Sequence, residues 1–244
     1  MTQPVIDRRM NYASPAILAR RARILELARE LIAEQGYARF SMKELGVRAG
    51  VAKQTLYNIF QSKERLIASA ITALFEINEA AVDYHSQPGT MERMIERTIA
   101  VWRIGHQTIN YMSAIIAIYH SPDAAPDIWD TIHAVGCYSH AAWIEALASA
   151  DMLQPWVDAQ TLIDEMVAYR YAIVLAWCQR RLDDDEMLRR LVVGSLCMVL
   201  GSTRGPARTE IDSRLAEITA GGLPQYGDHA HSAQRGTKKS ILDY

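Results

Sequence analysis

Apolar residues recur three and four positions apart along most of the chain, with polar residues between them. This is the spacing of one face of an α-helix, whereas a half-buried strand would alternate at every second residue. No segment shows the strand alternation and no internal repeat emerges, so the pattern predicts an all-α protein. Beyond residue 60, the expected helices cover about 62–86, 90–102, 109–119, 127–150, 158–181, 184–202 and 210–220.

Residues 41–63 are predicted to form two short helices joined by a tight turn. Ser41 and Glu44 have the spacing of a capping box, in which each side chain accepts a hydrogen bond from the other residue's backbone N–H. Gly50 permits the sharp turn between the helices. This arrangement predicts a helix-turn-helix that reads DNA. The alternative is an ordinary helical hairpin with a polar outer face that binds nothing.

The flanking segments place further short motifs at consistent spacing around this hairpin. They are RILELA at 23–28, Gly36-Tyr37, Phe40-Ser41, Ala49-Gly50-Val51, Thr55-Leu56-Tyr57 and Ser62-Lys63-Glu64. Together they resemble the amino-terminal domain of the tetracycline-repressor (TetR) family over about residues 20–80. The resemblance implies an N-terminal three-helix helix-turn-helix DNA-binding domain, followed over 81–222 by a larger helical ligand-binding and dimerisation domain. Residues 223–244 are polar and lack periodicity, so we expect a disordered tail there.

The resemblance also implies roles for single residues of the motif. Thr55, Tyr57 and Lys63 match positions that usually touch phosphates in the family. Lysine suits guanine and side-chain amides suit adenine, so the outer face of the second helix is expected to reach base edges. The expected DNA-binding set is Lys43, Arg48, Lys53, Gln54, Thr55, Tyr57, Asn58 and Lys63.

Two positions depart from the family pattern. Ala52 stands where the family often has a serine that caps the second helix. Because alanine cannot form this cap, the start of that helix is expected to be less stable by about 1 kcal/mol. Ile59 stands where the family often has a histidine, so one expected phosphate contact is absent.

The charge distribution agrees with a DNA-binding amino end. Residues 1–67 hold 12 Lys and Arg against 6 Asp and Glu, whereas the remaining residues hold 14 against 22. A basic end that faces phosphates and an acidic remainder are expected of such a protein. The apolar runs fall short of the roughly 18 residues of a membrane span, and the first residues lack an apolar signal core. Three widely spaced cysteines indicate no disulfide framework. We therefore expect a cytoplasmic protein with no membrane partner.

The segment 191–200 is apolar nearly all round. A surface helix would show one apolar stripe, so this helix is expected to bury a second face against another subunit. A central core helix of a monomer is the alternative. In the family, the last two long helices form a four-helix bundle with those of a second subunit, and two DNA-binding domains then read a pseudo-palindromic operator. The expected dimer contacts are Leu191, Gly194, Ser195 and Met198.

Aromatic and histidine side chains gather in the predicted carboxy-terminal domain. The resemblance implies a small hydrophobic effector inside this domain, although aromatics at helical spacing also form plain core. The expected ligand-binding residues are Trp102, His106, Tyr111, Tyr119, His120, Trp129, His133, Trp143 and Tyr169. Arg170 is suited to an acidic ligand, but we favour an ion pair with Asp164 or Glu165 across the dimer seam.

One further constellation suggests a metal. His133, Cys137 and His140 stand at positions i, i+4 and i+7 of one predicted helix, and four-residue spacing places pairs of ligands on one face. Three ligands along one straight helix rarely converge on one ion, so we expect no metal and no cofactor. A metal- or redox-responsive regulator using this His/Cys face is the alternative to a ligand-responsive dimeric repressor. No catalytic motif stands out, so we expect no enzyme. A third possibility is a helical ligand-binding protein whose amino-terminal domain no longer binds DNA.

Overall fold

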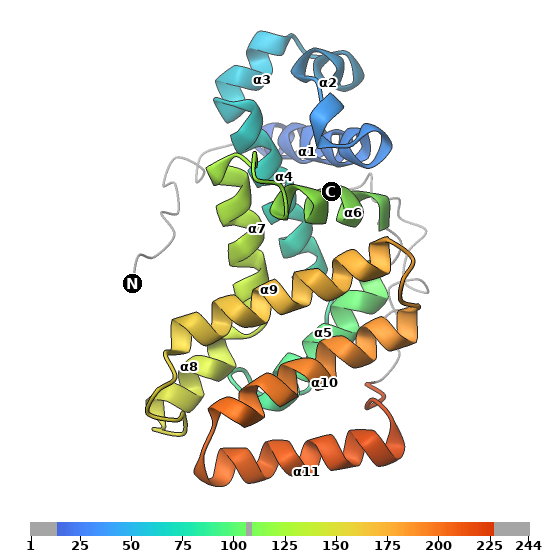
Figure 1. Ribbon diagram of the computed structural model, residues 1–244. Helices are drawn as coiled ribbons and strands as arrows, with labels where there is room; N and C mark the ends of the chain where they lie inside the picture. Colours follow the sequence, from blue (N-terminus) through green and yellow to red (C-terminus); the bar gives the residue numbers. More distant parts are fainter. Residues whose placement is uncertain (1–13, 106–108, 227–244) are drawn as a thin grey trace.

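The computed structural model describes residues 14–105 and 109–226, and these form helices with short connections (Figure 1). The described residues contain no strand, only one isolated bridge between Leu153 and Thr203. The predicted all-α class is therefore confirmed. The elements are α1 (Pro15–Gln35), η2 (Tyr37–Arg39), α2 (Met42–Ala49), α3 (Lys53–Phe60), α4 (Lys63–Ala80), α5 (Met91–Gly105), α6 (Ile109–Tyr119), α7 (Pro126–Tyr138), α8 (Ala141–Ser149), α9 (Ala159–Cys178), α10 (Asp184–Ser202) and α11 (Gly205–Gly221).

The helix-turn-helix is formed by α2 and α3. Ser41 accepts from the Glu44 backbone N–H and caps α2, and Gly50 ends this helix in the left-handed conformation at φ 64°. Gly46 lets the two helices approach, because a Cβ there would lie 2.8 Å from the backbone oxygen of Val51. As expected, Ala52, which precedes α3 at the N-cap position, provides no side-chain cap.

Only half of the predicted capping box forms. Glu44 does not return to the backbone of Ser41. Its carboxylate instead accepts hydrogen bonds from Gln35 at 2.8 Å and from Arg48 at 3.1 Å. The glutamate thus ties α2 to the end of α1, and that tertiary bond competes with the local one.

The long helix after Ser62 is shorter than predicted. α4 ends at Ala80, and the following loop is fastened by Glu96 of α5. The fully buried Glu96 carboxylate accepts from the backbone N–H groups of His85 at 2.9 Å and Ser86 at 3.0 Å. These bonds satisfy the loop without a continued helix.

The predicted helix over 127–150 is two helices. The chain turns at Ser139 and His140, where both backbone N–H groups bond to carbonyls three residues earlier and close α7. Both side chains are buried, and the Ser139 hydroxyl accepts from Arg97 of α5. The turn lets α8 pack separately from α7. The periodicity of the segment does not reveal the break, because apolar residues continue through it.

The hydrophobic core divides differently from the predicted domains. One cluster joins α1–α4 to α6, α7 and α9 without interruption, and it runs from Ile24 to Leu191. A second cluster lies between α5, α8, the start of α9, α10 and α11. Figure 1 shows α6 below α1 and α11 across the far end of the molecule. The helix-turn-helix therefore shares a core with the helices beneath it.

One apolar face of α10 is covered within its own chain. Val192, Leu196 and Val199 share the second cluster with Ala207 and Ile211 of α11, a helix that is longer than the predicted 210–220 segment. Residues 223–226 fall in the predicted tail, yet Tyr226 packs against this cluster and its backbone oxygen accepts from Arg103 at 3.0 Å. The rest of the predicted tail lies outside the described residues. No helix in the described part of the chain is long and apolar enough to cross a membrane.

Candidate functional site

The outer face of α3 carries the side chains predicted to reach bases. Lys53, Gln54 and Asn58 are exposed, and Thr55 and Tyr57 are partly buried beside them. Gln54 donates to Asn58 at 3.1 Å, and the Lys53 ammonium lies 5.5 Å from the centre of the Tyr57 ring. The face thus presents a cation and two amides held by weak, exchangeable contacts. Such groups suit phosphates and base edges.

Lys43 and Lys63 flank this face from the neighbouring helices. Lys43 is exposed on α2. Lys63 opens α4, where its ammonium lies 4.6 Å from the centre of the Tyr37 ring. The aromatic ring holds this cation beside the first turn of α4, whose N–H groups also favour anions.

Arg48 lies in a different environment from the other predicted DNA-binding residues. Its guanidinium donates two hydrogen bonds to Glu34 of α1, at 2.9 and 2.7 Å, and one to Glu44. The bonds to Glu34 raise the pKa of Arg48 and lower the pKa of Glu34. The charge of Arg48 is therefore compensated, and the side chain ties α2 to α1. The sequence gives no local sign of this bond, because the partners are on different helices.

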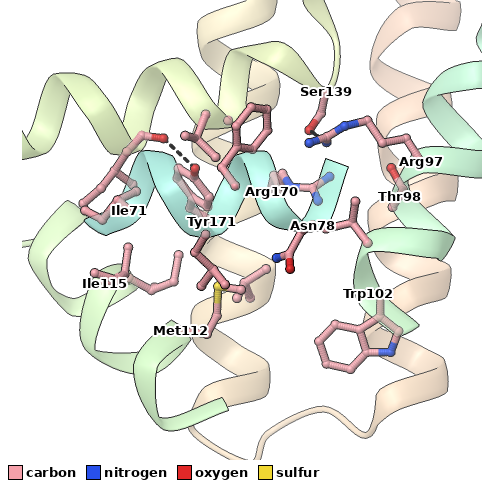
Figure 2. Close-up of a pocket in the computed structure, with 18 of the residues that line it drawn as sticks. Ile71, Asn78, Arg97, Thr98, Trp102, Met112, Ile115, Ser139, Arg170 and Tyr171 are labelled. Atoms are coloured by element: carbon pink, nitrogen blue, oxygen red, sulfur yellow. Dashed lines mark hydrogen bonds between the residues drawn. The ribbon is translucent and has the colours of Figure 1, made fainter. Parts of the chain in front are cut away.

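A cavity of about 140 Å³ lies beneath the DNA-binding helices, between α4, α5, α6, α7 and α9 (Figure 2). Its wall is mostly apolar and includes Ile71, Leu74, Phe75, Val101, Trp102, Tyr111, Met112, Ile115, Ile116, Ile132, Val135, Tyr171, Val174 and Leu191. Few polar side chains interrupt this wall: Asn78, Glu79, Arg97, Thr98, Ser139 and Arg170. An apolar cavity with a few polar groups is the usual form of a small-molecule site.

Two of these polar groups form a buried ion pair. Arg97 Nη2 lies 2.6 Å from Glu79 Oε1, and both side chains are largely shielded from solvent. The other Glu79 oxygen accepts from the Tyr84 hydroxyl at 2.9 Å. The Arg97 guanidinium also lies beside the rings of Phe75 and Tyr138, 5.5 and 5.1 Å from their centres. Together with Glu79 and the Ser139 hydroxyl, these rings hold Arg97 in place.

The structure separates the predicted ligand-binding residues. Trp102 and Tyr111 line the cavity. Tyr119, Trp129 and His133 form an aromatic stack elsewhere, with Trp129 5.3 Å from Tyr119 and 4.8 Å from His133, and the exposed His120 meets the Tyr119 ring edge-on.

Two of the remaining three predicted residues lie apart from both groups. Trp143 is buried in the second core cluster, and Tyr169 lies between α9 and α10, where its hydroxyl donates to the Arg190 backbone oxygen at 2.9 Å. His106 lies outside the described residues. The sequence missed Asn78, Arg97 and Ser139, which carry no local signal because their helices meet only in the tertiary structure.

The predicted His/Cys face on one helix does not form. α7 ends at Tyr138, so His140 leaves the helix and is buried, and neither ring nitrogen has a hydrogen-bond partner among the described residues. Asp164 of α9 comes close instead, and potential ligand atoms of His133, Cys137 and Asp164 lie within 4.8 Å of one another. However, His133 bonds to Asp164 at 3.0 Å and Tyr119 at 3.3 Å, and burial raises the pKa of the Cys137 thiol. These residues are already arranged as a hydrogen-bonded packing cluster.

The four predicted dimer contacts point in two directions. Leu191 lines the cavity and Ser195 is 2% exposed, so both face the interior of their own subunit. Gly194 and Met198 are partly buried, and Cys197 between them is exposed. The outer face of α10 is therefore marked by small and flexible side chains.

Comparisons with known proteins place the amino-terminal domain in a family. Residues 24–70 match the family described as bacterial regulatory proteins, tetR family. The chain is 35% identical over 83 residues to the HTH-type transcriptional repressor KstR of Mycolicibacterium smegmatis, a match that covers 34% of this chain and 41% of KstR. It is 32% identical over 92 residues to the HTH-type transcriptional regulator EthR of the same organism, covering 37% of this chain and 42% of EthR. The matches thus span about two fifths of each curated relative.

Solved structures extend the similarity of fold over most of the chain. A putative TetR-family regulator from Rhodococcus sp. superposes with a TM-score of 0.58 at 17% identity, covering 75% of this chain and 98% of that one. A TetR-family regulator from Streptomyces coelicolor gives 0.57 at 16% identity, covering 90% and 96%. These proteins therefore share the fold of the chain over most of its length. The amino-terminal domain of the chain, over residues 24–70, is therefore of the type found in the tetR family of bacterial regulatory proteins.

Proposed function

We propose that this protein is a dimeric transcriptional repressor that a small molecule releases from its operator. The observation that carries the proposal is the placement of α4. This helix begins at Lys63, shortly after α3, the helix that carries the proposed base-reading residues. Further along α4, Ile71, Leu74 and Asn78 line the cavity. A single rigid element thus connects the DNA-binding face to the cavity.

The DNA-binding half of the proposal rests on the polar face of α3. Lys53, Gln54 and Asn58 are exposed together, and no carboxylate lies among the residues of this helix. A single helix of this length makes few base contacts. Two such helices, spaced one turn of DNA apart (about 34–36 Å), combine their affinities on a pseudo-palindrome.

Dimerisation is proposed to use the outer faces of α9 and α10. Four of the exposed positions there are small, namely Ala168 and Ala172 on α9 and Cys197 and Gly201 on α10, and charged residues such as Glu165 and Arg190 border them. Small residues allow close approach of helices from a second subunit. Gly194 and Met198 border this surface, whereas Leu191 and Ser195 support it from inside.

The proposed response to an effector is a matter of thermodynamic coupling between ligand binding and DNA binding. A ligand releases DNA only if it binds the DNA-incompetent arrangement better than the competent one. Moving a two-state equilibrium from 1:99 to 99:1 needs a preference of about 5.5 kcal/mol. α3 and α4 pack in one hydrophobic core together with α1 and α6. A ligand that displaces α4 at Leu74 would therefore also move α3.

The proposal is tested by fluorescence anisotropy of the full chain on DNA from its own promoter region. Tight, salt-sensitive and sequence-selective binding is expected, and the salt dependence should fall in Lys63→Ala. Arg208→Ala, which removes a positive charge from α11, is the matched control and should bind like the wild type. The titration is repeated with EDTA, which should change nothing. Equal affinity for operator and random DNA would overturn the proposal.

A further inference from the structure

The cavity contains one positive charge that has no hydrogen-bonded or ion-paired partner among the described residues. Arg170 of α9 lines the cavity and forms no hydrogen bond or ion pair with any residue in 14–105 or 109–226. Figure 2 shows its guanidinium and the Asn78 amide directed into the space between the helices. The side chain therefore lies inside the subunit, away from the dimer seam at which the sequence suggested an ion pair.

The other charges of the wall offset Arg170 only in part, because Glu79 is already paired with Arg97 and acts on Arg170 only through its longer-range charge. The wall contains three charged residues, and two of them, Arg97 and Glu79, form the 2.6 Å ion pair. The cavity thus holds a net charge of one positive unit. Burial and the nearby Arg97 lower the pKa of Arg170 to about 10, and this value still leaves the guanidinium charged at neutral pH.

A guanidinium group in a largely apolar cavity is stabilised by a bound anion. Transfer of a charge from water into a shielded site is unfavourable, and proteins normally offset it with a partner. Guanidinium groups favour carboxylates, because two parallel N–H groups match the two carboxylate oxygens. The Asn78 amide, which also makes no side-chain hydrogen bond with a described residue, offers a further donor.

The apolar part of the cavity wall indicates what kind of molecule would carry the anionic group. Trp102, Met112, Ile115 and Val174 line the cavity with apolar surface, which favours an apolar body. A volume of about 140 Å³ favours a small one.

We propose that the cavity binds a small amphipathic acid, with its carboxylate on Arg170 and its apolar body against α5 and α6. This inference rests on the proposed function, because it names the class of effector for the same site. A neutral molecule of the same shape would leave Arg170 uncompensated, and an amine would be repelled.

The test uses the full chain without DNA and matched probes. These are octanoate and 4-phenylbutyrate, each beside its alcohol and its amine. Binding is measured by calorimetry and by the thermal midpoint. Both acids are expected to bind at least tenfold more tightly than their alcohols, and the amines should not bind. Failure of both acids to bind, or equal binding of acid and alcohol, would overturn the proposal.

Substitutions at position 170 locate the contact. In Arg170→Met, acid affinity should fall at least tenfold while alcohol affinity stays the same, and Arg170→Lys should lie between the two. Arg208→Met, on α11, is the control and should bind the acids like the wild type. Without ligand, Arg170→Met should melt at the same or a higher temperature, because an uncompensated charge is gone. A lower melting temperature, or unchanged acid binding, would contradict the proposal.

Adding the acids to the protein–operator complex separates this inference from the proposed function. Acid binding that depends on Arg170 but leaves operator affinity unchanged would refute the effector response and keep the acid site. Release of the operator by a neutral compound, with no acid binding, would keep the response and refute the acid site.

Discussion

The hydroxyl of Tyr169 on α9 occupies the space directly over Gly194 on α10, where a side chain at position 194 would lie. The Tyr169 ring carbon Cε1 would lie 2.7 Å from such a Cβ, so the whole ring, and not only its tip, is in the way. The hydroxyl also donates to the Arg190 backbone oxygen at 2.9 Å. Gly194 thus holds α9 and α10 in their present register by leaving room for one ring.

We expect Gly194→Ala to lower the free energy of unfolding by about 1–2 kcal/mol, because the ring must swing aside and lose its hydrogen bond. Urea denaturation measures this loss, and ultracentrifugation should show a weakened dimer. Gly221→Ala, in the last turn of α11 and away from the proposed dimer surface, is the control. A Cβ there meets nothing within 4 Å, so it should be neutral or stabilising by up to about 1 kcal/mol. Equal effects of the two substitutions would show that the Tyr169 contact is unimportant.

Two substitutions in the DNA-binding face should separate base reading from phosphate binding. Gln54→Ala should cost about 1–3 kcal/mol on the operator and relax selectivity at one base pair. Lys63→Ala should weaken operator and random DNA alike and reduce the salt slope by about 1. Anisotropy titrations over a salt series and on single-base operator variants measure both. The assignment fails if Gln54→Ala changes all sequences equally.

Filling the cavity from α4 should uncouple the effector from DNA. Leu74 lines the cavity, so a tryptophan there would occupy ligand space and hold α4 in one position. We expect Leu74→Trp to bind the operator like the wild type but to remain bound when the effector is added. The control is Ile77→Trp on the same helix, where the side chain is 55% exposed. Normal induction in Leu74→Trp would exclude α4 as the transmitting element.

His140 should make the protein less stable in mild acid. Burial, together with the positive charges of Arg170 and Arg97, holds the pKa of its ring well below the ordinary value. The unfolded chain therefore takes up the proton first, at a pKa of about 6.5. Stability is fully present above this pH and falls below it, by about 1.4 kcal/mol per pH unit for one proton.

Chemical denaturation between pH 7.5 and 5.5 measures this loss. The His140→Leu variant should lose much of the slope, whereas His120→Gln, which changes an exposed histidine just after α6, should retain it. A slope that persists in His140→Leu would assign the acid sensitivity to other groups.

Local features of the molecule could be read from the sequence, because their causes lie within a few residues. The caps at Ser41 and Ser62 and the left-handed turn at Gly50 involve bonds across three or four positions. The missing cap at Ala52 and the helical periodicity are equally local. The polar face of α3 follows from that periodicity, so its exposed residues could be identified in advance.

The tertiary structure decided everything that depends on which helix faces which. Trp102 and Tyr119 have the same chemistry in the sequence, yet one lines the cavity and the other stacks on Trp129 outside it. Arg170 has charged neighbours along its own helix but lines the cavity, where no residue that the structure describes forms a hydrogen bond or ion pair with it, while Arg48 pairs with Glu34 of another helix. The periodicity of a helix determines that it has an apolar face. The direction of that face, and the groups that meet there, depend on packing between residues far apart in the chain.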